Sequence, residues 1–280
     1  MQIVANAPED YRDLFLGFVG YINIGDTTPE RSGFRLDGVI YYDVAADRNS
    51  SFGPFFGFFH EVGHMIDWAL APSEQYQKFT QRDELGVELK SALQRDVEGR
   101  LWELAGGIVV GVESPARIAS LAPNTTTNYH NQRTVDNYHN YIRRSAVNNI
   151  MAGRVIDVEE DEVENLPPHE QFQWNLQNAM SNVLRTGSDQ NPNNMINPSN
   201  IFGGITNNAV RGGVGHSYEH YWFDEQGNST YFQNVEFFAN HFAATMLNNE
   251  SMLQNEREFF PTALPILEEV VVDMLGRRGR

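Results

Sequence analysis

One stretch of the chain, residues 55–69, limits the fold more than any other because its aromatic and polar residues recur with a helical period. It reads FFGFFHEVGHMIDWA and follows Pro54, a residue type common at the start of helices. We therefore predict a helix that packs an aromatic side on a core and carries a separate polar stripe. At about 100° per residue, the core side gathers Phe55, Phe59, Val62, Ile66 and Ala69, and the polar side gathers Gly57, His60, Glu61, His64 and Asp67.

The polar stripe has the ligand spacing of a metal site. His60 and His64 are four residues apart, so both imidazoles project from one row of the helix and can ligate one ion. In a His-Glu-x-x-His helix the glutamate, here Glu61, lies beside a zinc ion and takes a proton from its bound water. The chain has eight histidines and no cysteine, so the other ligands must be His, Asp or Glu. Two histidines exposed by chance on a surface helix are the alternative.

A catalytic zinc site needs a third protein ligand from elsewhere in the chain. The metzincin class is excluded, because Asp67 and Leu70 stand where its glycine and third histidine would be. The best candidate is Glu236 in NVEFFANHFAATM, where Asn240 shares its helical face and is placed to hydrogen-bond a ligand histidine. An acid near a helix start also has a simpler explanation in the helix dipole, so spacing alone leaves Glu236 open. His241 should point away from this pair, toward the surface or the core.

Two known groups carry similar motifs. HEVGHMID followed far downstream by EFFAN resembles the zinc peptidase domain of anthrax lethal factor and its relatives. The segment SNIFGGITNNAVRGGVGHSYEHYW, with VEFFANHFAA after it, is similar to the zincin-like domains of phage head-morphogenesis proteins and polymorphic toxins. The resemblance implies a Zn²⁺ cofactor, with His60, His64 and Glu236 as ligands and Glu61 as the general base. Asn240 stands where lethal factor has a glutamate, whereas the phage and toxin domains share the asparagine.

A peptidase also needs a hydrogen-bond donor for the oxyanion that forms during hydrolysis. The resemblance to lethal factor implies a tyrosine shortly before the ligand glutamate, which fits either Tyr221 or Tyr231. We predict Tyr221 together with His216, because both lie in the glycine-flanked loop GHSYEHYW. Aromatic packing within that loop is the alternative. Asp67, one turn beyond His64, is predicted to orient a ligand histidine.

The rest of the chain predicts an α+β fold that is mostly helical. A strand is expected at 37–45, a solvated acidic run at 157–164, and an extended loop or internal boundary in the Asn- and Pro-rich stretch 186–200. The strand comes just before the motif helix, as the edge strand does in zincins, so an extended peptide substrate is predicted to pair with it. Apolar periodicity predicts the remaining helices at 8–19, 82–105, 133–151, 168–185, 234–248 and 262–276.

We predict one zincin-like metallopeptidase domain over 1–280, with 71–198 as a large helical insertion. The formal charge of −17 argues against nucleic acid or an anionic membrane as a partner. No apolar run is long enough to span a membrane and no classical signal peptide is visible, so a soluble, cytoplasmic protein is the default, with secretion or a phage particle left open.

The predicted activity is that of a zinc metalloendopeptidase acting on a peptide or protein substrate. Zn²⁺ activates the water and Glu61 takes its proton. The alternative is a catalytically silent zincin-like structural or binding module of phage or toxin origin. Retention of Glu61 favours the enzyme, because a purely structural site needs no base.

Overall fold

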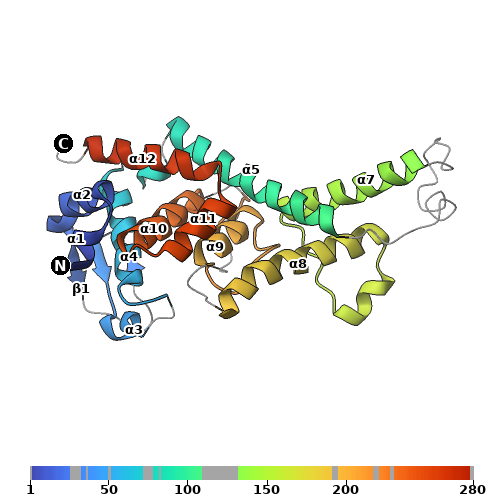
Figure 1. The fold of residues 1–280 in the computed structure, drawn as a ribbon, viewed down its shortest axis with the longest axis horizontal. Coiled ribbons are helices and arrows are strands. Elements are labelled where there is room, and N and C mark those ends of the chain that lie inside the picture. The colour runs from blue at the N-terminus through green and yellow to red at the C-terminus, as the bar shows by residue number, and fades with distance from the viewer. Residues whose placement is uncertain are drawn as a thin grey trace.

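Helices make up most of the protein, and a small three-stranded sheet lies at one end (Figure 1). This computed structural model describes residues 2–25, 33–35, 37–49, 52–71, 78–81, 83–108, 132–190, 195–216, 221–227 and 230–277. The prediction of an α+β, mostly helical chain is confirmed. The α-helices are α1 (Gln2–Asn6), α2 (Glu9–Phe18), α3 (Val44–Arg48), α4 (Phe56–Ala69), α5 (Asp83–Gly107), α7 (Gln132–Met151), α8 (Pro168–Gln190), α9 (Ile196–Ile205), α10 (Phe232–Met246), α11 (Glu250–Phe259) and α12 (Ala263–Arg277). The 3-10 helices are η1 (Val19–Tyr21), η2 (Phe79–Gln81) and η3 (Glu160–Asn165), and the strands are β1 (Asn23–Gly25), β2 (Gly33–Phe34) and β3 (Val39–Tyr41).

Apolar periodicity located the long helices correctly. The predicted helices correspond to α2, α4, α5, α7, α8, α10 and α12. In α5 the apolar stripe packs as expected, with Leu89, Leu93, Val97 and Leu101 fully buried. The acidic run 157–164 is largely exposed, as predicted, although part of it forms η3.

The Asn- and Pro-rich stretch 186–200 was predicted as an extended loop or internal boundary, and this prediction is wrong at both ends of the stretch, while 191–194 lie outside the described residues. Helix α8 continues to Gln190, and α9 begins at Ile196. Every residue of α9 is buried. The Asn197 side chain donates to the buried Glu256 at 2.7 Å, so tertiary contacts override the loop propensity of this composition. Helix α11 was also missed.

The strand predicted at 37–45 lies at the centre of the sheet. The strand order is β1-β3-β2, with β1 parallel and β2 antiparallel to β3. Only Val39–Tyr41 of this segment pairs as a strand, because the Asp43 side chain accepts two backbone N–H groups and starts α3. The prediction that this segment is the edge strand for a peptide is therefore wrong. The edges of the sheet are β1 and β2, and β2 contacts α4.

Helices α4 and α10 cross closely at the centre of the main body and carry the two parts of the predicted metal site (Figure 1). The crossing is tight because small residues meet there: a Cβ added to Gly63 would lie 3.0 Å from the Ala239 Cα. Phe59, Val62 and Phe238 are buried around it. Residues far apart in the sequence are thereby brought to one place.

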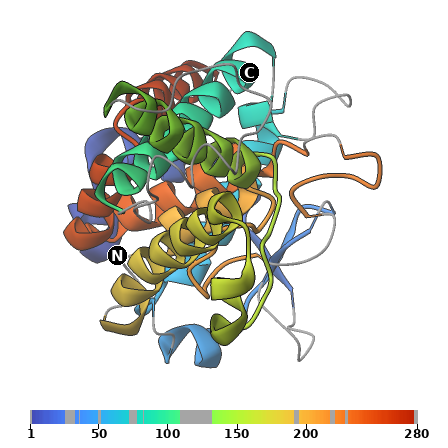
Figure 2. The ribbon, with the colours of Figure 1, turned by 90° about the vertical axis from the view of Figure 1, so that its right-hand side faces the viewer.

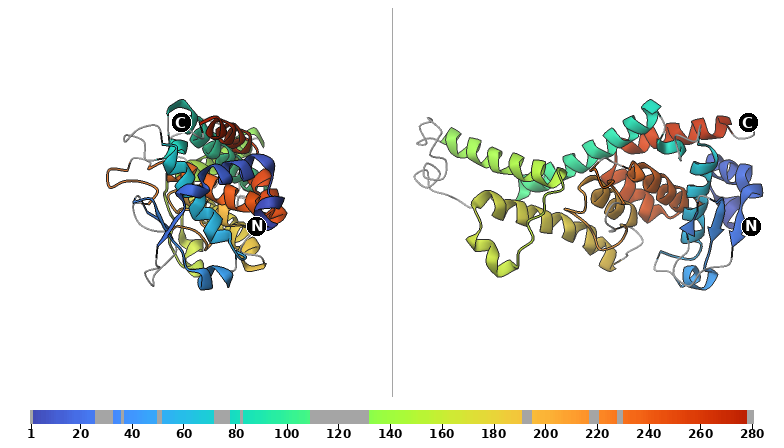
Figure 3. Two further views of the ribbon diagram at one scale, coloured as in Figure 1. Left: turned by 90° about the vertical axis from the view of Figure 1, so that its left-hand side faces the viewer. Right: turned by 180° about the vertical axis from the view of Figure 1, so that it is seen from behind.

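A helical arm extends from the main body on the side away from the sheet. We define the arm as α7, α8 and the last part of α5, and it is seen from both sides in Figures 1 and 3 and along its length in Figure 2. Within it α7 packs on α8, and both contact α5. The described parts of the predicted insertion are thus mainly helical, while its bounds at 71–198 stay a prediction. Among the described helices, these long ones included, none is both long and apolar enough to cross a membrane.

Candidate metal centre

Helix α4 starts at Phe56 because a carboxylate from the neighbouring α3 caps it. Asp47 accepts hydrogen bonds from the Phe55 N–H at 2.6 Å and the Gly57 N–H at 2.8 Å. These are N–H groups that a helix start leaves without partners. A Cβ on Gly57 would lie 2.7 Å from Asp47 Oδ1, so a side chain there would displace the cap. Phe55, predicted on the core side of the helix, is instead its left-handed N-cap residue and is 45% exposed.

Three predicted ligand residues converge where α4 crosses α10. His60 Nε2 and His64 Nε2 lie 3.0 Å apart. Glu236 Oε1 lies 3.5 Å from His64 Nε2, and Glu236 Oε2 lies 3.7 Å from His60 Nε2. One ligand atom from each residue thus lies within 4.8 Å of the others. Two imidazoles and one carboxylate are a donor set typical of catalytic zinc.

The charge states of these groups suit a cation. Burial lowers the pKa of His60, and His64 lowers it further, so the imidazole tends to stay neutral and able to ligate. Burial opposes ionisation of Glu236, but His64, His216 and His60 outweigh it and hold its pKa well below the ordinary range. Glu236 Oε2 is buried without a hydrogen-bond partner among the described residues. A bound cation would satisfy this oxygen, so the site fits a metal ion.

Glu61 is held by the edge strand β2. The Phe34 N–H donates to Glu61 Oε2 at 2.6 Å, and Glu61 is 9% exposed. The Phe34 ring packs against Trp68, which fixes β2 on the outer face of α4. The orientation of the predicted base is therefore set by a backbone group of the sheet edge.

Tyr221 and His216 both reach the ligand carboxylate from the segment between α9 and α10. Tyr221 Oη donates a hydrogen bond to Glu236 Oε1, and His216 Nε2 lies 3.3 Å from the same oxygen. Their rings stack with centroids 4.1 Å apart. The alternative tyrosine, Tyr231, is the N-cap residue of α10, and its ring lies under the Lys90 ammonium. Of the two tyrosines, Tyr221 is therefore the one placed at the candidate centre.

Buried residues that the sequence reasoning missed hold His216 in position. Asn200 Oδ1 accepts the His216 N–H at 2.9 Å, and Trp222 Nε1 donates to the His216 carbonyl at 3.2 Å. Gly215 has φ +103°, and a Cβ there would lie 2.0 Å from Asn200 Oδ1. The glycines of GGVGH were the only sequence signal for this clamp.

Two predicted supporting contacts are not formed. Asp67 does not reach a ligand histidine, because its oxygens accept the Thr80 N–H and the Thr80 hydroxyl, each at 2.8 Å. It joins α4 to η2 instead. Asn240 is fully buried on α10, but neither atom of its amide has a hydrogen-bond partner in the described chain. The predictions that Asp67 and Asn240 orient ligand histidines are therefore wrong.

Lys78 also lies beside the centre, and no spacing in the sequence pointed to it. Its ammonium donates to the His64 carbonyl at 3.1 Å and lies 4.8 Å from the centre of the Phe34 ring. Burial lowers the pKa of Lys78, against the opposing effects of Asp67, Glu236 and Glu61. The Lys78 side chain therefore lies within electrostatic range of the base and the ligand carboxylate.

Comparison with known proteins does not add to this picture. No family model matches the chain, and neither a curated protein nor a solved structure matches it.

Proposed function

We propose that the protein is a zinc-dependent metallopeptidase with a zincin-like fold and Glu61 as its general base. The observation that carries this proposal is the meeting of His60, His64 and Glu236 at the α4–α10 crossing, with Glu61 next to His60 on the same helix. A structural metal site has no use for a carboxylate base beside it. The antiparallel edge strand β2 against α4 further supports the zincin-like arrangement.

The ion would be held by His60 Nε2, His64 Nε2 and an oxygen of Glu236. When bound, zinc would supply a Lewis acid that polarises the scissile carbonyl and lowers the pKa of water to about 7. Glu61 accepts the proton of the attacking water and returns it to the leaving amine. The Phe34 N–H binds Glu61 Oε2 and keeps the carboxylate from rotating away.

Tyr221 and His216, which both contact Glu236 Oε1 in this structure, would turn toward the oxyanion as its donors when substrate binds. Burial raises the pKa of Tyr221 well above its ordinary value, and Glu236 adds to the effect, so the phenol keeps its proton and remains a donor. One such donor is typically worth about 10²- to 10³-fold in rate. The clamp from Asn200 and Trp222 fixes the backbone that carries His216.

The substrate is an extended peptide that pairs with β2 rather than with β3. Strand β3 has neighbours on both sides, whereas β2 is an edge strand beside Glu61. Because the Phe34 N–H is bound to Glu61, a peptide would pair with the other backbone groups of this edge. A peptide beside β2 would run past the base and the metal ligands. Backbone pairing would supply affinity, and side pockets would supply selectivity.

Metal analysis and a peptide-library assay test the proposal together. The purified protein should hold about one zinc per chain, the stoichiometry of a single catalytic site. His60→Ala should lose the metal, while His169→Ala, a change at an exposed histidine of α8, should keep it. Absence of zinc from the wild-type protein would overturn the proposal.

Glu61→Gln separates an enzyme from a silent module. It should keep the zinc but cleave peptides about 10²- to 10⁴-fold more slowly, the usual contribution of a general base. Glu88→Gln on α5 is the matched control and should keep full activity. Equal cleavage by the Glu61→Gln protein would refute the assigned role, and a zinc-loaded wild type that cleaves no peptide would favour the silent module.

A further inference from the structure

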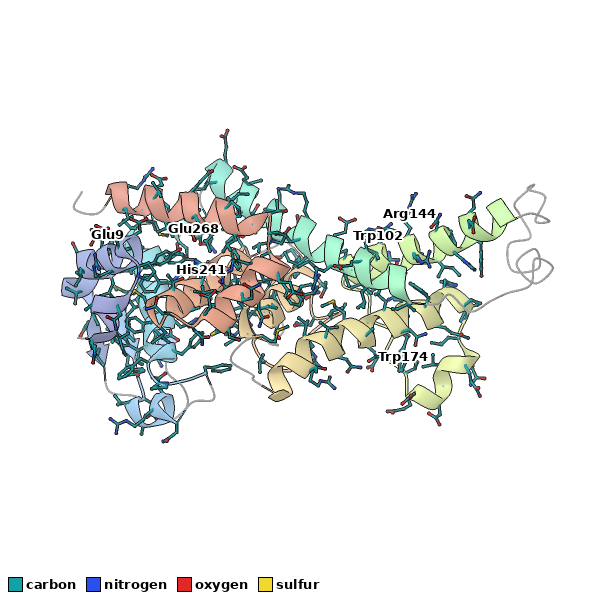
Figure 4. All side chains as sticks on the ribbon, in the orientation of Figure 1. Glu9, Trp102, Arg144, Trp174, His241 and Glu268 are labelled. Atoms are coloured by element: carbon teal, nitrogen blue, oxygen red, sulfur yellow. The ribbon has the colours of Figure 1, made fainter. Side chains whose placement is uncertain are left out.

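A cavity of about 380 Å³ lies between α2, α10, α11 and α12, away from the metal centre. Its lining comes from four helices: Pro8, Glu9, Asp10, Tyr11, His241, Thr245, Leu253, Arg257, Leu264 and Glu268. Figure 4 labels Glu9, His241 and Glu268, which come from three of these helices. The volume falls within the range of about 300 to 1,000 Å³ that small-molecule sites occupy.

The floor of the cavity is a buried, hydrogen-bonded network. His241 Nδ1 lies 2.5 Å from Glu256 Oε2, and His241 Nε2 lies 2.8 Å from the Tyr11 hydroxyl. Thr245 Oγ1 lies 3.4 Å from the same nitrogen. His241, Tyr11 and Thr245 are each at most 5% exposed. The floor is therefore polar, and its hydroxyl groups are engaged with His241 and Glu268.

The exposed rim of the cavity, formed by Glu9, Asp10, Arg257 and Glu268, carries more acidic than basic side chains. Glu256 balances His241 in the floor, and Arg257 is paired with Glu250. The Glu9 and Asp10 side chains form no hydrogen bond or ion pair with the described part of the chain. Glu268 is 53% exposed, and both of its oxygens have partners: Oε1 lies 3.5 Å from His241 Nε2, and Oε2 accepts the Tyr11 hydroxyl at 3.3 Å. The negative charges without a partner are therefore those of Glu9 and Asp10.

We infer that this cavity is a binding site for a small organic cation that carries a guanidinium or ammonium group. The cationic head would pair with the carboxylates of Glu9, Asp10 and Glu268, and planar guanidinium fits carboxylates in two-point contacts. The walls from Pro8, Leu253 and Leu264 would cover an aliphatic stem. The source is either a free molecule of arginine size or a basic side chain of a partner protein.

The site is separate from the metal centre. Thr245 and Glu236 lie nine residues apart on α10, which at about 100° per residue puts them on opposite faces of the helix. The inference therefore stands whether or not the protein is a peptidase. It also means that binding should persist in the His60→Ala protein.

Calorimetric titration with four probes tests the inference. L-arginine and agmatine should bind saturably, and citrulline, in which a neutral urea replaces the guanidinium, should not. The blocked peptide acetyl-Gly-Arg-Gly-amide distinguishes the sources: tighter binding than free arginine points to a partner's side chain, and weaker binding points to a free small molecule. No saturable binding of any cationic probe, or equal binding of citrulline, would overturn the inference.

Variants separate this site from the general acidity of the protein. Glu9→Gln and Glu268→Gln should each weaken arginine binding about threefold to fivefold, the value of one partly exposed ion pair. If Glu268→Gln also perturbs His241, Glu9→Gln still tests the site, because the Glu9 side chain has no hydrogen bond or ion pair in the described chain that the change could remove. Glu269→Gln, at the exposed neighbouring position of α12, is the matched control and should leave binding unchanged. An equal loss with Glu269→Gln would show diffuse attraction and refute the site.

Discussion

The ion pair of His241 with Glu256 should make the stability of the protein fall as the solution becomes alkaline. Burial alone would lower the pKa of His241, but Glu256 and Glu268 outweigh it and raise the pKa from 6.5 to about 9. Between these values the folded protein keeps a proton on His241 that the unfolded chain has lost. The stabilisation is therefore complete below about pH 6.5 and is lost as the pH rises through about 9.

The size of the effect follows from proton linkage. One proton bound only by the folded state changes the unfolding free energy by about 1.4 kcal/mol per pH unit. Across the interval from 6.5 to about 9, the loss is about 3 kcal/mol for this fully buried group. Such a loss is a large fraction of the roughly 5 to 15 kcal/mol that stabilises a typical domain.

Glu256→Gln is the perturbation that isolates this pair. Glutamine has nearly the same shape as glutamate. The Asn197 Oδ1 is buried without a hydrogen-bond partner in the described chain, and after rotation of the Asn197 side chain it can accept a hydrogen bond from the glutamine N–H₂ group. Urea unfolding of both proteins at pH 6.5, 7.5 and 9 gives the comparison. The variant should be less stable at pH 6.5 but should lose less than about half as much free energy on going to pH 9.

Subtracting the two pH profiles removes the contributions of other groups, such as Lys78, that titrate in both proteins. Parallel profiles for the wild type and Glu256→Gln would show that His241 carries no extra proton in the folded state. The assigned charge on the cavity floor would then be wrong.

Two changes test how the helix of the metal centre is positioned. Gly63→Val should destabilise the protein by about 1 to 3 kcal/mol and weaken zinc binding, because the valine side chain would push against Ala239 at the crossing. The control Gly99→Ala, at a position in α5 with open space around it, should be neutral or stabilising in the same urea assay. Asp47→Ala should cost about 2 kcal/mol by removing the α4 cap, whereas Asp43→Ala should cost less because it caps only the short α3. Equal losses within either pair would contradict these assignments.

The motif helix could be predicted because its signal is local. The i, i+4 spacing of His60 and His64 and the aromatic period both lie within a few turns of one helix. Glu236 could be proposed from the sequence for the same reason, since its own helix has a clear apolar pattern. The packing of α4 on α10 depends on the close contact of Gly63 with Ala239. A glycine within a helical sequence does not indicate which helix it will contact.

Contacts between distant segments account for the wrong predictions. The position of β3 between two strands depends on pairing with β1 and β2, which the composition of 37–45 does not specify. Asp67 lies one turn from His64, but Thr80 offers it two donors and thereby decides its orientation. The Asn- and Pro-rich start of α9 is helical because its side chains find buried partners such as Glu256.

Two neighbouring residues of α10 differ in their hydrogen bonding, one in the buried His241 network and the other beside the candidate metal centre. His241 has partners at both ring nitrogens, whereas the adjacent Asn240 has none for either amide atom among the described residues. The Nδ1 atoms of His60 and His64 and Glu236 Oε2 are likewise buried without partners in that part of the chain. Each such atom costs about 1 to 3 kcal/mol, so a fold selected only for stability would not collect them around one crossing. Five of the ten such atoms among the described residues belong to His60, His64, Glu236 and Asn240, which supports the proposal that this crossing binds an ion.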